Sequence, residues 1–320
     1  MEYKKFGRTG LDVSVAGLGC GGNSRLGQNA GKSVAESVAL VREAIDLGVN
    51  IFDTAANYGT EPIVGEAIKA MPRERVVVAT KAAIRKGEAL IPTETVIKSL
   101  EASLRHLDTD YVDVFQPHAV PPWAYDHVRE KLVPALLREK EKGKIRHIGV
   151  SETSPGDHSH SMLQRAVEDD VWEVAMLGYH MMHQQARAKI FPRTMANGIG
   201  TLIMFVVRNI FSRPGHLQKA MQELAKDGLV SAELAAQENP LDFLIHEGGA
   251  SSLTDAAYRF VRHTPGADVV LFGTGSREHL RTNIESILKP PLPEADVAKL
   301  HDLFGHLQGV GLELPDHHKD

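Results

Sequence analysis

Cysteine is almost absent from this sequence, since Cys20 is the only one among 320 residues. A single thiol excludes an intramolecular disulfide and a multi-cysteine zinc site. Proteins that depend on disulfides belong to oxidising compartments, so this composition favours a cytoplasmic protein.

Long apolar runs and a basic excess are also absent. The longest apolar stretch, residues 198–207, is far shorter than the roughly 20 residues that span a bilayer. The opening MEYKKFGRTG has no apolar core of a signal peptide. A net charge of −5 gives no general attraction to nucleic acid or acidic lipid. We expect neither kind of partner, and the composition predicts no oligomeric state.

Two glycine-rich stretches come close to phosphate-binding motifs without fitting them. Gly17, Gly19 and Gly22 spell G-x-G-x-x-G after a strand-like run, but NSRLGQNAGK intervenes where a dinucleotide-binding fold must open a helix. Residues 26–33, LGQNAGKS, have a loop too short to wrap a triphosphate as a P-loop does. Both stretches are interpreted as glycine turns.

Short apolar runs alternate along the chain with stretches of helical period. The runs occupy residues 13–19, 49–54, 75–80, 111–116, 144–151, 172–177, 200–205 and 267–273. Strands that are buried on both faces and separated by helices indicate a parallel sheet. Eight such units predict a closed (β/α)8 TIM barrel, with residues 1–320 as one domain.

Helical periods between these runs are clear at several places. Residues 33–48 begin with Ser33 and Glu36 in a capping box, and residues 93–107 have the same period. The apolar positions that share one face of the first helix are Val34, Val38, Val41 and Ile45.

Three segments fall outside the regular alternation. KKFGRTGLDVS predicts an N-terminal β-hairpin over the barrel floor, turning at residues 8–10. Residues 206–250 form a long connection before the helix at 253–263 and contain a further helix at 217–228. An extra helix at 294–304 precedes a polar tail. Because long connections are often functional, we expect the connection and the tail to cover the active site.

Four polar side chains follow the predicted strands at or just beyond their ends, namely Asp53, Tyr58, Lys81 and His118. Each alone has a structural explanation, as a turn cap, a packed ring, a surface lysine or a core histidine. Together they fall on three neighbouring strands, at the barrel mouth where such enzymes place their sites.

These side chains suit the protonation of an oxyanion. A lysine held charged by an aspartate lowers the pKa of an adjacent phenol, so that Tyr58 can act as a general acid. His118 can donate a hydrogen bond to a carbonyl oxygen that becomes negative. The hydride must come from a cofactor, since no side chain supplies one.

FDTAANYG, VVVATK, DYVDVFQPH and GKIRHIGVS resemble, in this order, the signatures of the aldo-keto reductase superfamily. The resemblance implies a (β/α)8 barrel that binds NADP(H), less often NAD(H). It implies that Tyr58 is the acid/base, that Lys81 and Asp53 tune it, and that His118 orients a small-molecule carbonyl. The implied reaction is reduction of an aldehyde or ketone to an alcohol, or the reverse. Two alternatives stay open, an NAD-dependent sugar or secondary-alcohol dehydrogenase and a cofactor-binding regulatory subunit with little turnover.

The resemblance also implies a set of nicotinamide contacts. Ser151 and Glu152 stand where the family has Ser-Asn, so we expect the Glu152 carboxylate to accept from the carboxamide NH2. The implied nicotinamide-side residues are Asp53, Ser151, Glu152, Met176, Tyr179, Met204 and Phe205.

GTGSREHLRTN at 273–283 resembles the family's loop and helix for the adenosine phosphates, since a helix N-terminus attracts phosphate. The basic residues here are Arg277, Arg281 and His279, with Arg208 farther off, and we favour NADP over NAD because an arginine matches a 2′-phosphate. The alternative is that Arg277 and Arg281 form a solvated helix face. We expect no metal site. The implied residues at this end are Gly273, Thr274, Gly275, Ser276, His279 and Asn283.

Overall fold

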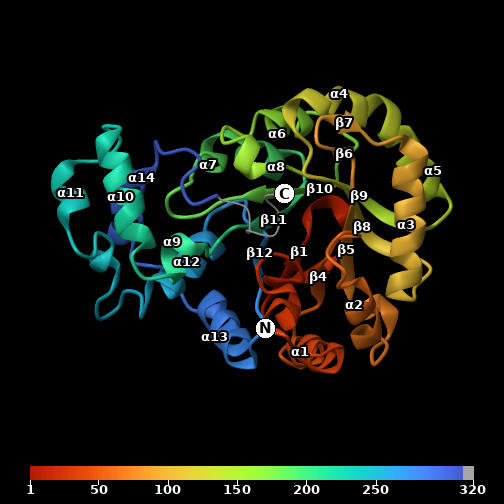
Figure 1. Cartoon of the computed structure of the whole chain (residues 1–320), viewed down its shortest axis with the longest axis horizontal. Helices are drawn as coiled ribbons and strands as arrows, with labels where there is room; N and C mark the ends of the chain where they lie inside the picture. The colour runs from red at the N-terminus through yellow and green to blue at the C-terminus, as the bar shows by residue number, and fades with distance from the viewer. Residues whose placement is uncertain (313–320) are drawn as a thin grey trace.

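The chain folds as a closed barrel of eight parallel strands surrounded by helices, which confirms the predicted (β/α)8 class (Figure 1). The computed structural model describes residues 1–312, and the end of the polar tail, at 313–320, lies outside the described residues. Around the barrel the strands follow chain order. They are β3 (Ala16–Gly19), β4 (Ile51–Asp53), β5 (Val77–Ala83), β8 (Val112–His118), β9 (Ile145–Ser151), β10 (Val174–Gly178), β11 (Gly200–Met204) and β12 (Val269–Phe272).

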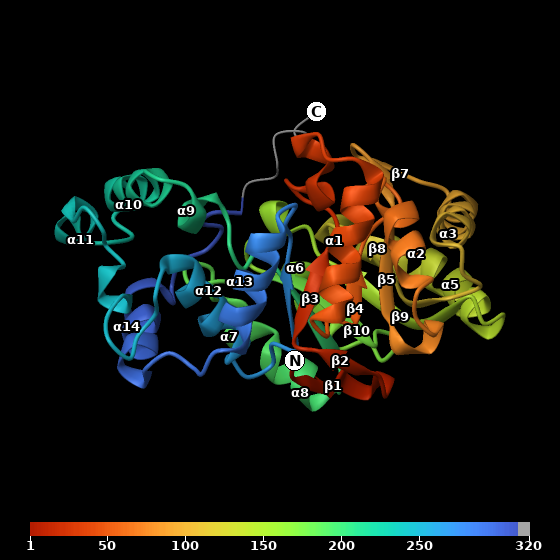
Figure 2. The ribbon, with the colours of Figure 1, turned by 90° about the horizontal axis from the view of Figure 1, so that it is seen from below.

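An N-terminal hairpin closes one end of the barrel, as predicted (Figure 2). Its strands are β1 (Tyr3–Lys5) and β2 (Asp12–Ser14), joined by a 3-10 turn at Gly7–Thr9. Phe6 is fully buried and packs with Ile51, Val77 and other residues that fill the barrel interior. The run 13–19, predicted as one strand, belongs to two, because the chain turns from the hairpin into the barrel at Val15.

Most helices lie outside the strands and cover the barrel. Their bounds are α1 (Val34–Asp46), α2 (Glu61–Ile68), α3 (Thr93–Leu107), α4 (Tyr125–His127), α5 (Val133–Glu141), α6 (Ser161–Ala166), α7 (Ala186–Lys189), α8 (Phe191–Ala196), α12 (Leu253–Arg262) and α13 (Arg277–Leu288). The capping box of α1 is present, with Ser33 and Glu36 bonded reciprocally. Val34 is 58% exposed, because it stands in the first turn, before the apolar face reaches the core. Residues 1–312 contain no helix with the length and apolar character needed to cross a bilayer.

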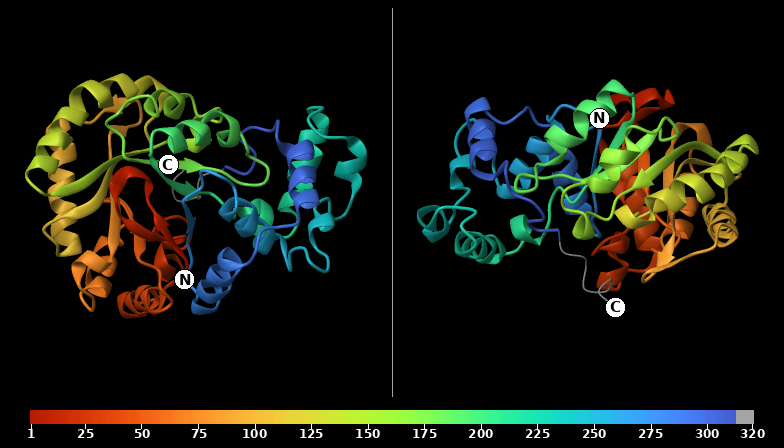
Figure 3. Two further views of the ribbon diagram at one scale, coloured as in Figure 1. Left: turned by 180° about the vertical axis from the view of Figure 1, so that it is seen from behind. Right: turned by 90° about the horizontal axis from the view of Figure 1, so that it is seen from above.

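Most of the long connection forms a lobe beside the barrel (Figures 1 and 3), whereas its first part, within residues 206–213, lines a cavity at the barrel mouth, which agrees in part with the expectation that the connection covers the active site. It carries α9 (Asn209–Ser212), α10 (His216–Lys226) and α11 (Ala232–Ala236), and it packs with α14 (Glu294–Phe304). The helices predicted at 217–228 and 294–304 are therefore present. His246 Nε2 lies 3.0 Å from the Asp296 carboxylate, and Lys299 Nζ lies 4.1 Å from the centre of the Phe243 ring. The lobe thus joins two segments that are separated along the chain.

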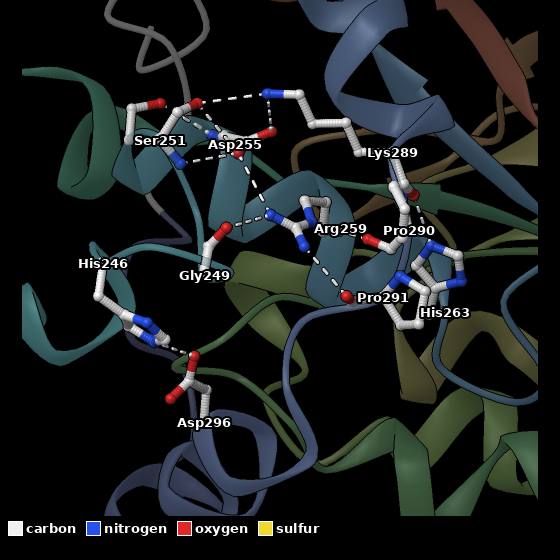
Figure 4. A network of polar contacts seen from close by, with 11 residues as sticks. His246, Gly249, Ser251, Asp255, Arg259, His263, Lys289, Pro290, Pro291 and Asp296 are labelled. Carbon is white, nitrogen blue, oxygen red and sulfur yellow. Dashed lines mark hydrogen bonds and ion pairs between the residues drawn. The ribbon is translucent and has the colours of Figure 1, made fainter.

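A buried arginine ties this lobe to the barrel helices (Figure 4). The Arg259 side chain donates hydrogen bonds to the carbonyl oxygens of Gly249, Pro290 and Pro291 at 2.7, 2.8 and 3.0 Å. Asp255 lies 3.6 Å from the same guanidinium and 3.2 Å from Lys289 Nζ. The end of the connection, α12 and the segment before α14 therefore meet at one side chain.

Candidate functional site

Strand alternation brings three of the four predicted catalytic side chains to the barrel axis. Successive residues of a strand point to opposite faces, so Asp53 shares the inward face of β4 with Ile51, and Lys81 shares that of β5 with Val77. His118, the last residue of β8, likewise follows the buried Val114 by four positions. The pleat thus places polar groups directly above the apolar interior.

Lys81 and Asp53 form a buried ion pair at the bottom of the site. Their Nζ and Oδ1 atoms lie 2.6 Å apart, and Lys81 also donates to the carbonyl oxygen of Thr54 at 2.8 Å. Neither side chain is more than 4% exposed. Burial raises the pKa of the Asp53 carboxyl, and the Lys81 ammonium opposes this rise. Each charge depends on the other for its stability in this environment.

Tyr58 comes from the loop after β4 and completes the group. Its hydroxyl lies 3.3 Å from His118 Nε2, and its ring meets the imidazole edge to face. Lys81 Nζ lies 5.4 Å from the centre of the phenol ring. Gly21 permits this position, because a Cβ atom there would lie 2.4 Å from Tyr58 Cε2. The structure therefore brings all four predicted side chains together.

The expectation that Lys81 lowers the pKa of Tyr58 is wrong for this structure. Burial raises the pKa of the phenol above its ordinary value, and the Asp53 charge raises it further. The cation is already compensated by Asp53 at 2.6 Å, so little of its field acts on the phenol. Tyr58 therefore holds its proton at neutral pH, which is the form a proton donor requires.

A cavity of about 1270 Å³ opens at the carboxyl ends of the strands and includes these four residues. Typical pockets for drug-sized ligands measure about 300–1,000 Å³, so this one has room for a larger ligand together with a substrate. Most predicted cofactor residues line it, namely Asp53, Ser151, Glu152, Met176, Met204, Phe205, Gly273, Thr274, His279 and Asn283.

Tyr179, Gly275 and Ser276 are not among the lining residues, contrary to the sequence-based expectation. Tyr179 is fully buried and stacks on Phe260 at 5.7 Å, so its ring belongs to the core. A Cβ atom at Gly275 would lie 2.4 Å from the Cα of Gly27, so this glycine serves close backbone packing. The Ser276 hydroxyl caps α13 by accepting from the backbone N–H of His279.

The Glu152 carboxylate is engaged inside the protein, and the expectation that it receives a carboxamide NH2 is wrong for this structure. It accepts from the Ser154 hydroxyl at 2.6 Å and the Gly178 backbone N–H at 2.8 Å. Its other oxygen lies 2.7 Å from His160 Nδ1, and neither side chain of this pair is exposed. Glu152 therefore joins the ends of β9 and β10 within the cavity wall.

Several polar residues of the site were not found from the sequence. Gln116 is not among the lining residues but lies in register with Lys81, and neither polar atom of its buried amide has a hydrogen-bond partner among residues 1–312. Alternation from His118 back along β8 would have indicated it. Loop residues carry no such signal beyond their place after a barrel strand. Other polar residues that line the cavity and were not predicted include Asn23, Ser24, Asn57, Arg85, Thr153, Ser154, Asn209, Arg213 and Lys289.

The donors at the α13 end of the cavity fit a dinucleotide. The Ser24 hydroxyl is buried and has no partner within the described part of the chain. It lies 3.8 Å from where a Cβ atom at Gly273 would stand, beside the start of the 12-residue helix α13. Uncharged donors at a helix N-terminus are suited to phosphate oxygens.

Arg277 and Arg281, two of the basic residues on which the NADP preference rests, do not line the cavity, whereas His279 and Arg208 do. Both contact Glu43 on α1, at 3.1 and 2.6 Å. They form an exposed, ion-paired helix face, which agrees with the alternative that the sequence left open.

Comparison with known proteins gives a consistent result. Residues 17–304 match the sequence model of the Aldo/keto reductase family. L-galactose dehydrogenase of Arabidopsis thaliana is 34% identical over 209 residues, which cover 63% of this chain and 64% of that protein. The NADH-specific methylglyoxal reductase of Escherichia coli is 31% identical over 222 residues, 62% of this chain and 65% of that protein. The uncharacterized oxidoreductase YqkF of Bacillus subtilis is 26% identical over 94% of this chain and 95% of its own length.

Solved structures share the architecture. The holo form of aldo-keto reductase AKR11C1 from Bacillus halodurans covers 100% of both chains, with a TM-score of 0.71 and 20% identity. The thermostable aldo-keto reductase Tm1743, solved with the inhibitor epalrestat, gives a TM-score of 0.68 at 24% identity, over 95% of this chain and 100% of that one. At these identities the likeness concerns the fold alone.

Proposed function

This chain belongs to the aldo/keto reductase family of NAD(P)H-dependent oxidoreductases that act on carbonyl and alcohol groups, and we propose that Tyr58 is its proton donor. The observation that carries the proposal is the 3.3 Å approach of the Tyr58 hydroxyl to His118 Nε2. Both groups lie in the cavity, above the buried pair of Lys81 and Asp53.

A carbonyl oxygen placed between these two groups would contact both the Tyr58 hydroxyl and the His118 imidazole. Tyr58, which holds its proton at neutral pH, delivers it to the oxygen as negative charge develops there. His118 supplies a second polar contact that restricts the position of this oxygen. The dinucleotide supplies the hydride when it is bound. In the reverse direction Tyr58 takes the proton of an alcohol.

We assign the two ends of the cavity to the two halves of the dinucleotide. Ser151, Met176 and Phe205 would hold the nicotinamide, because they line the cavity on β9, on β10 and just after β11. Gly273, Thr274, His279 and Asn283 would hold the adenosine phosphates beside the start of α13. Of the basic residues on which the predicted preference for NADP rests, His279 and Arg208 line the cavity and Arg277 and Arg281 do not, so NADP stays a prediction and this assignment covers both dinucleotides. A cytoplasmic location and the absence of a nucleic-acid partner stay predictions.

Replacement of Tyr58 by Phe tests the catalytic role. We expect Tyr58→Phe to lower the rate of carbonyl reduction by about 10²- to 10⁴-fold, the range for loss of a general acid, with dinucleotide affinity unchanged. Single-turnover oxidation of the bound reduced dinucleotide measures this. The substrate panel should include an aldohexose and a 2-oxoaldehyde, since relatives are named for L-galactose and methylglyoxal.

Tyr3→Phe is the matched control, because Tyr3 lies on the floor hairpin and its hydroxyl bonds only the Gly48 carbonyl among the described residues. Tyr3→Phe should keep full activity. A Tyr58→Phe protein as fast as the unmodified chain would refute the assignment. Absence of turnover by the unmodified chain with every substrate would favour the regulatory-subunit alternative.

A further inference from the structure

The segment between β3 and α1 packs against Tyr58. A Cβ atom at Gly21 would lie 2.4 Å from Cε2 of the Tyr58 ring, so the ring is in close contact with this backbone. Arg25 follows a few residues later and is not among the residues that line the cavity. The residues of this segment that do line it are Gly21, Gly22, Asn23 and Ser24. The segment that confines the phenol ring therefore also carries an arginine outside the cavity.

Arg25 holds the backbone of Tyr58. Its Nε atom donates to the Tyr58 carbonyl oxygen at 2.8 Å, although the two residues are 33 positions apart in the sequence. Gly59 leaves room for the guanidinium, because a Cβ atom there would lie 2.7 Å from an Nη atom of Arg25. Asn57 and Gly59, on either side of Tyr58, are both exposed. Since solvent surrounds these neighbours, the hydrogen bond from Arg25 is what ties this turn to the segment before α1.

The backbone of Arg25 and Leu26 takes a conformation that is rare for residues with a side chain. Their φ angles are +42° and +57°, in the left-handed region, which a residue other than glycine occupies only where the surrounding structure imposes it. Leu26 is fully buried, and its carbonyl oxygen accepts from the Ser37 hydroxyl of α1 at 2.9 Å. The fold thus fixes the backbone from which the Arg25 side chain extends. Such conformations are found preferentially at functional sites.

Proton transfer from Tyr58 depends on the exact place of its hydroxyl. Donor and acceptor must come within about 2.6–3.2 Å of each other, and a displacement of about 1 Å lowers a rate by as much as about 100-fold. We propose that Arg25 is a positioning residue for the reaction, which holds the Tyr58 backbone so that the hydroxyl stays beside His118 Nε2. Arg25 acts through Tyr58, so this inference rests on the proposed function.

Two substitutions at Arg25 separate its hydrogen bond from its charge. At the place of the Arg25 Nε atom, methionine carries a methyl group and glutamine carries an amide nitrogen that still donates. Arg25→Met should lower the single-turnover rate of carbonyl reduction by about 10- to 100-fold, with unchanged Kd values for NADH and NADPH. Arg25→Gln should keep most of the rate, because it restores a donor to the Tyr58 carbonyl without the positive charge.

Arg42→Met is the matched control, because Arg42 also donates to a backbone carbonyl, that of Glu66 at 3.1 Å, and lies outside the cavity. It should leave the rate unchanged. The double variant Arg25→Met/Tyr58→Phe should be no slower than Tyr58→Phe, because Arg25 acts only through the Tyr58 proton. Thermal unfolding confirms that each variant is folded, and Arg25→Ala carries the same prediction if Arg25→Met is not.

A folded Arg25→Met protein with the full rate would overturn the inference. Equal losses in Arg25→Met and Arg25→Gln would overturn it as well, because the rate would then follow the charge rather than the hydrogen bond. So would an equal loss on adding Arg25→Met to Tyr58→Phe, since Arg25 would then act by another route. None of these results touches the role of Tyr58. A Tyr58→Phe protein with the full rate would instead refute the proposed function and, with it, this inference.

Discussion

Lys81 is the residue on which the electrostatics of the site depend. It is fully buried, and its ammonium has the Asp53 carboxylate and the Thr54 carbonyl as partners. Inside a protein, an isolated charge costs far more than a neutral pair. The position of Lys81 at the inward face of β5 is therefore stable only because β4 ends in a carboxylate at the same level.

Lys81→Met should leave the Asp53 carboxyl buried without its cation. We expect a loss of about 3–5 kcal/mol in unfolding free energy and at least a 100-fold lower rate of carbonyl reduction. The double variant Asp53→Asn/Lys81→Met should recover much of the stability but none of the activity, because a neutral pair fits the site but leaves the Tyr58 ring without the adjacent ammonium. Urea unfolding and single-turnover kinetics separate the two effects. A double variant as unstable as Lys81→Met would contradict the ion-pair explanation.

Helix α12 is the element that joins the lobe to the barrel. Arg259 is 6% exposed and donates to carbonyl oxygens of Gly249, Pro290 and Pro291. Proline has no backbone N–H to donate to a helix or a strand. The segment before α14 therefore depends on hydrogen bonds that its carbonyl groups accept. Arg259 thus replaces the hydrogen bonding that a helix or strand would provide.

Arg259→Met should destabilise the chain by roughly 3 kcal/mol, because three partly buried hydrogen bonds to carbonyl groups are lost at about 1 kcal/mol each. Limited proteolysis should then cut residues 206–250 faster than in the unmodified chain. The control is Arg193→Met, since Arg193 makes an exposed pair with Glu168 of a kind worth about 0–1 kcal/mol. Equal proteolysis of the two variants would show that Arg259 does not hold the lobe.

At the scale of the whole molecule, one set of contacts between neighbouring barrel strands makes the free energy of unfolding sensitive to acid. Glu173, just before β10, contacts His147 of β9 and Lys140 of α5 and accepts from the Ile148 backbone N–H. Burial alone raises the pKa of Glu173, but these hydrogen bonds lower it to about 2. A lowered carboxyl pKa stabilises the fold above the ordinary value of 4.5, and this stabilisation is lost as pH falls toward 2.

Glu173→Gln should therefore reduce the unfolding free energy at pH 7 by on the order of 3 kcal/mol. The difference from the unmodified chain should be constant down to about pH 4.5 and shrink below it. Urea unfolding at pH 7, 4.5 and 3.5 measures the trend, with the exposed Glu168→Gln as control. A difference that does not change with pH would show that the Glu173 contacts act by packing alone.

The order of strands and helices followed from the sequence because period and capping are local properties. Ser33 and Glu36 lie on one turn, and the apolar runs that became β4, β5 and β8 needed no distant partner to be noticed. The four catalytic candidates could be grouped for a related reason, since parallel strands of a barrel end at one rim.

The direction in which each charge acts could not be obtained in this way, because it depends on partners that are distant along the chain. Glu43 and Arg281 are separated by more than half of the sequence, yet they lie 2.6 Å apart. Glu152 is bound by Gly178 and His160, and Tyr58 is buried beside an already compensated Lys81. Electrostatic energies change with distance and burial, and folding sets both.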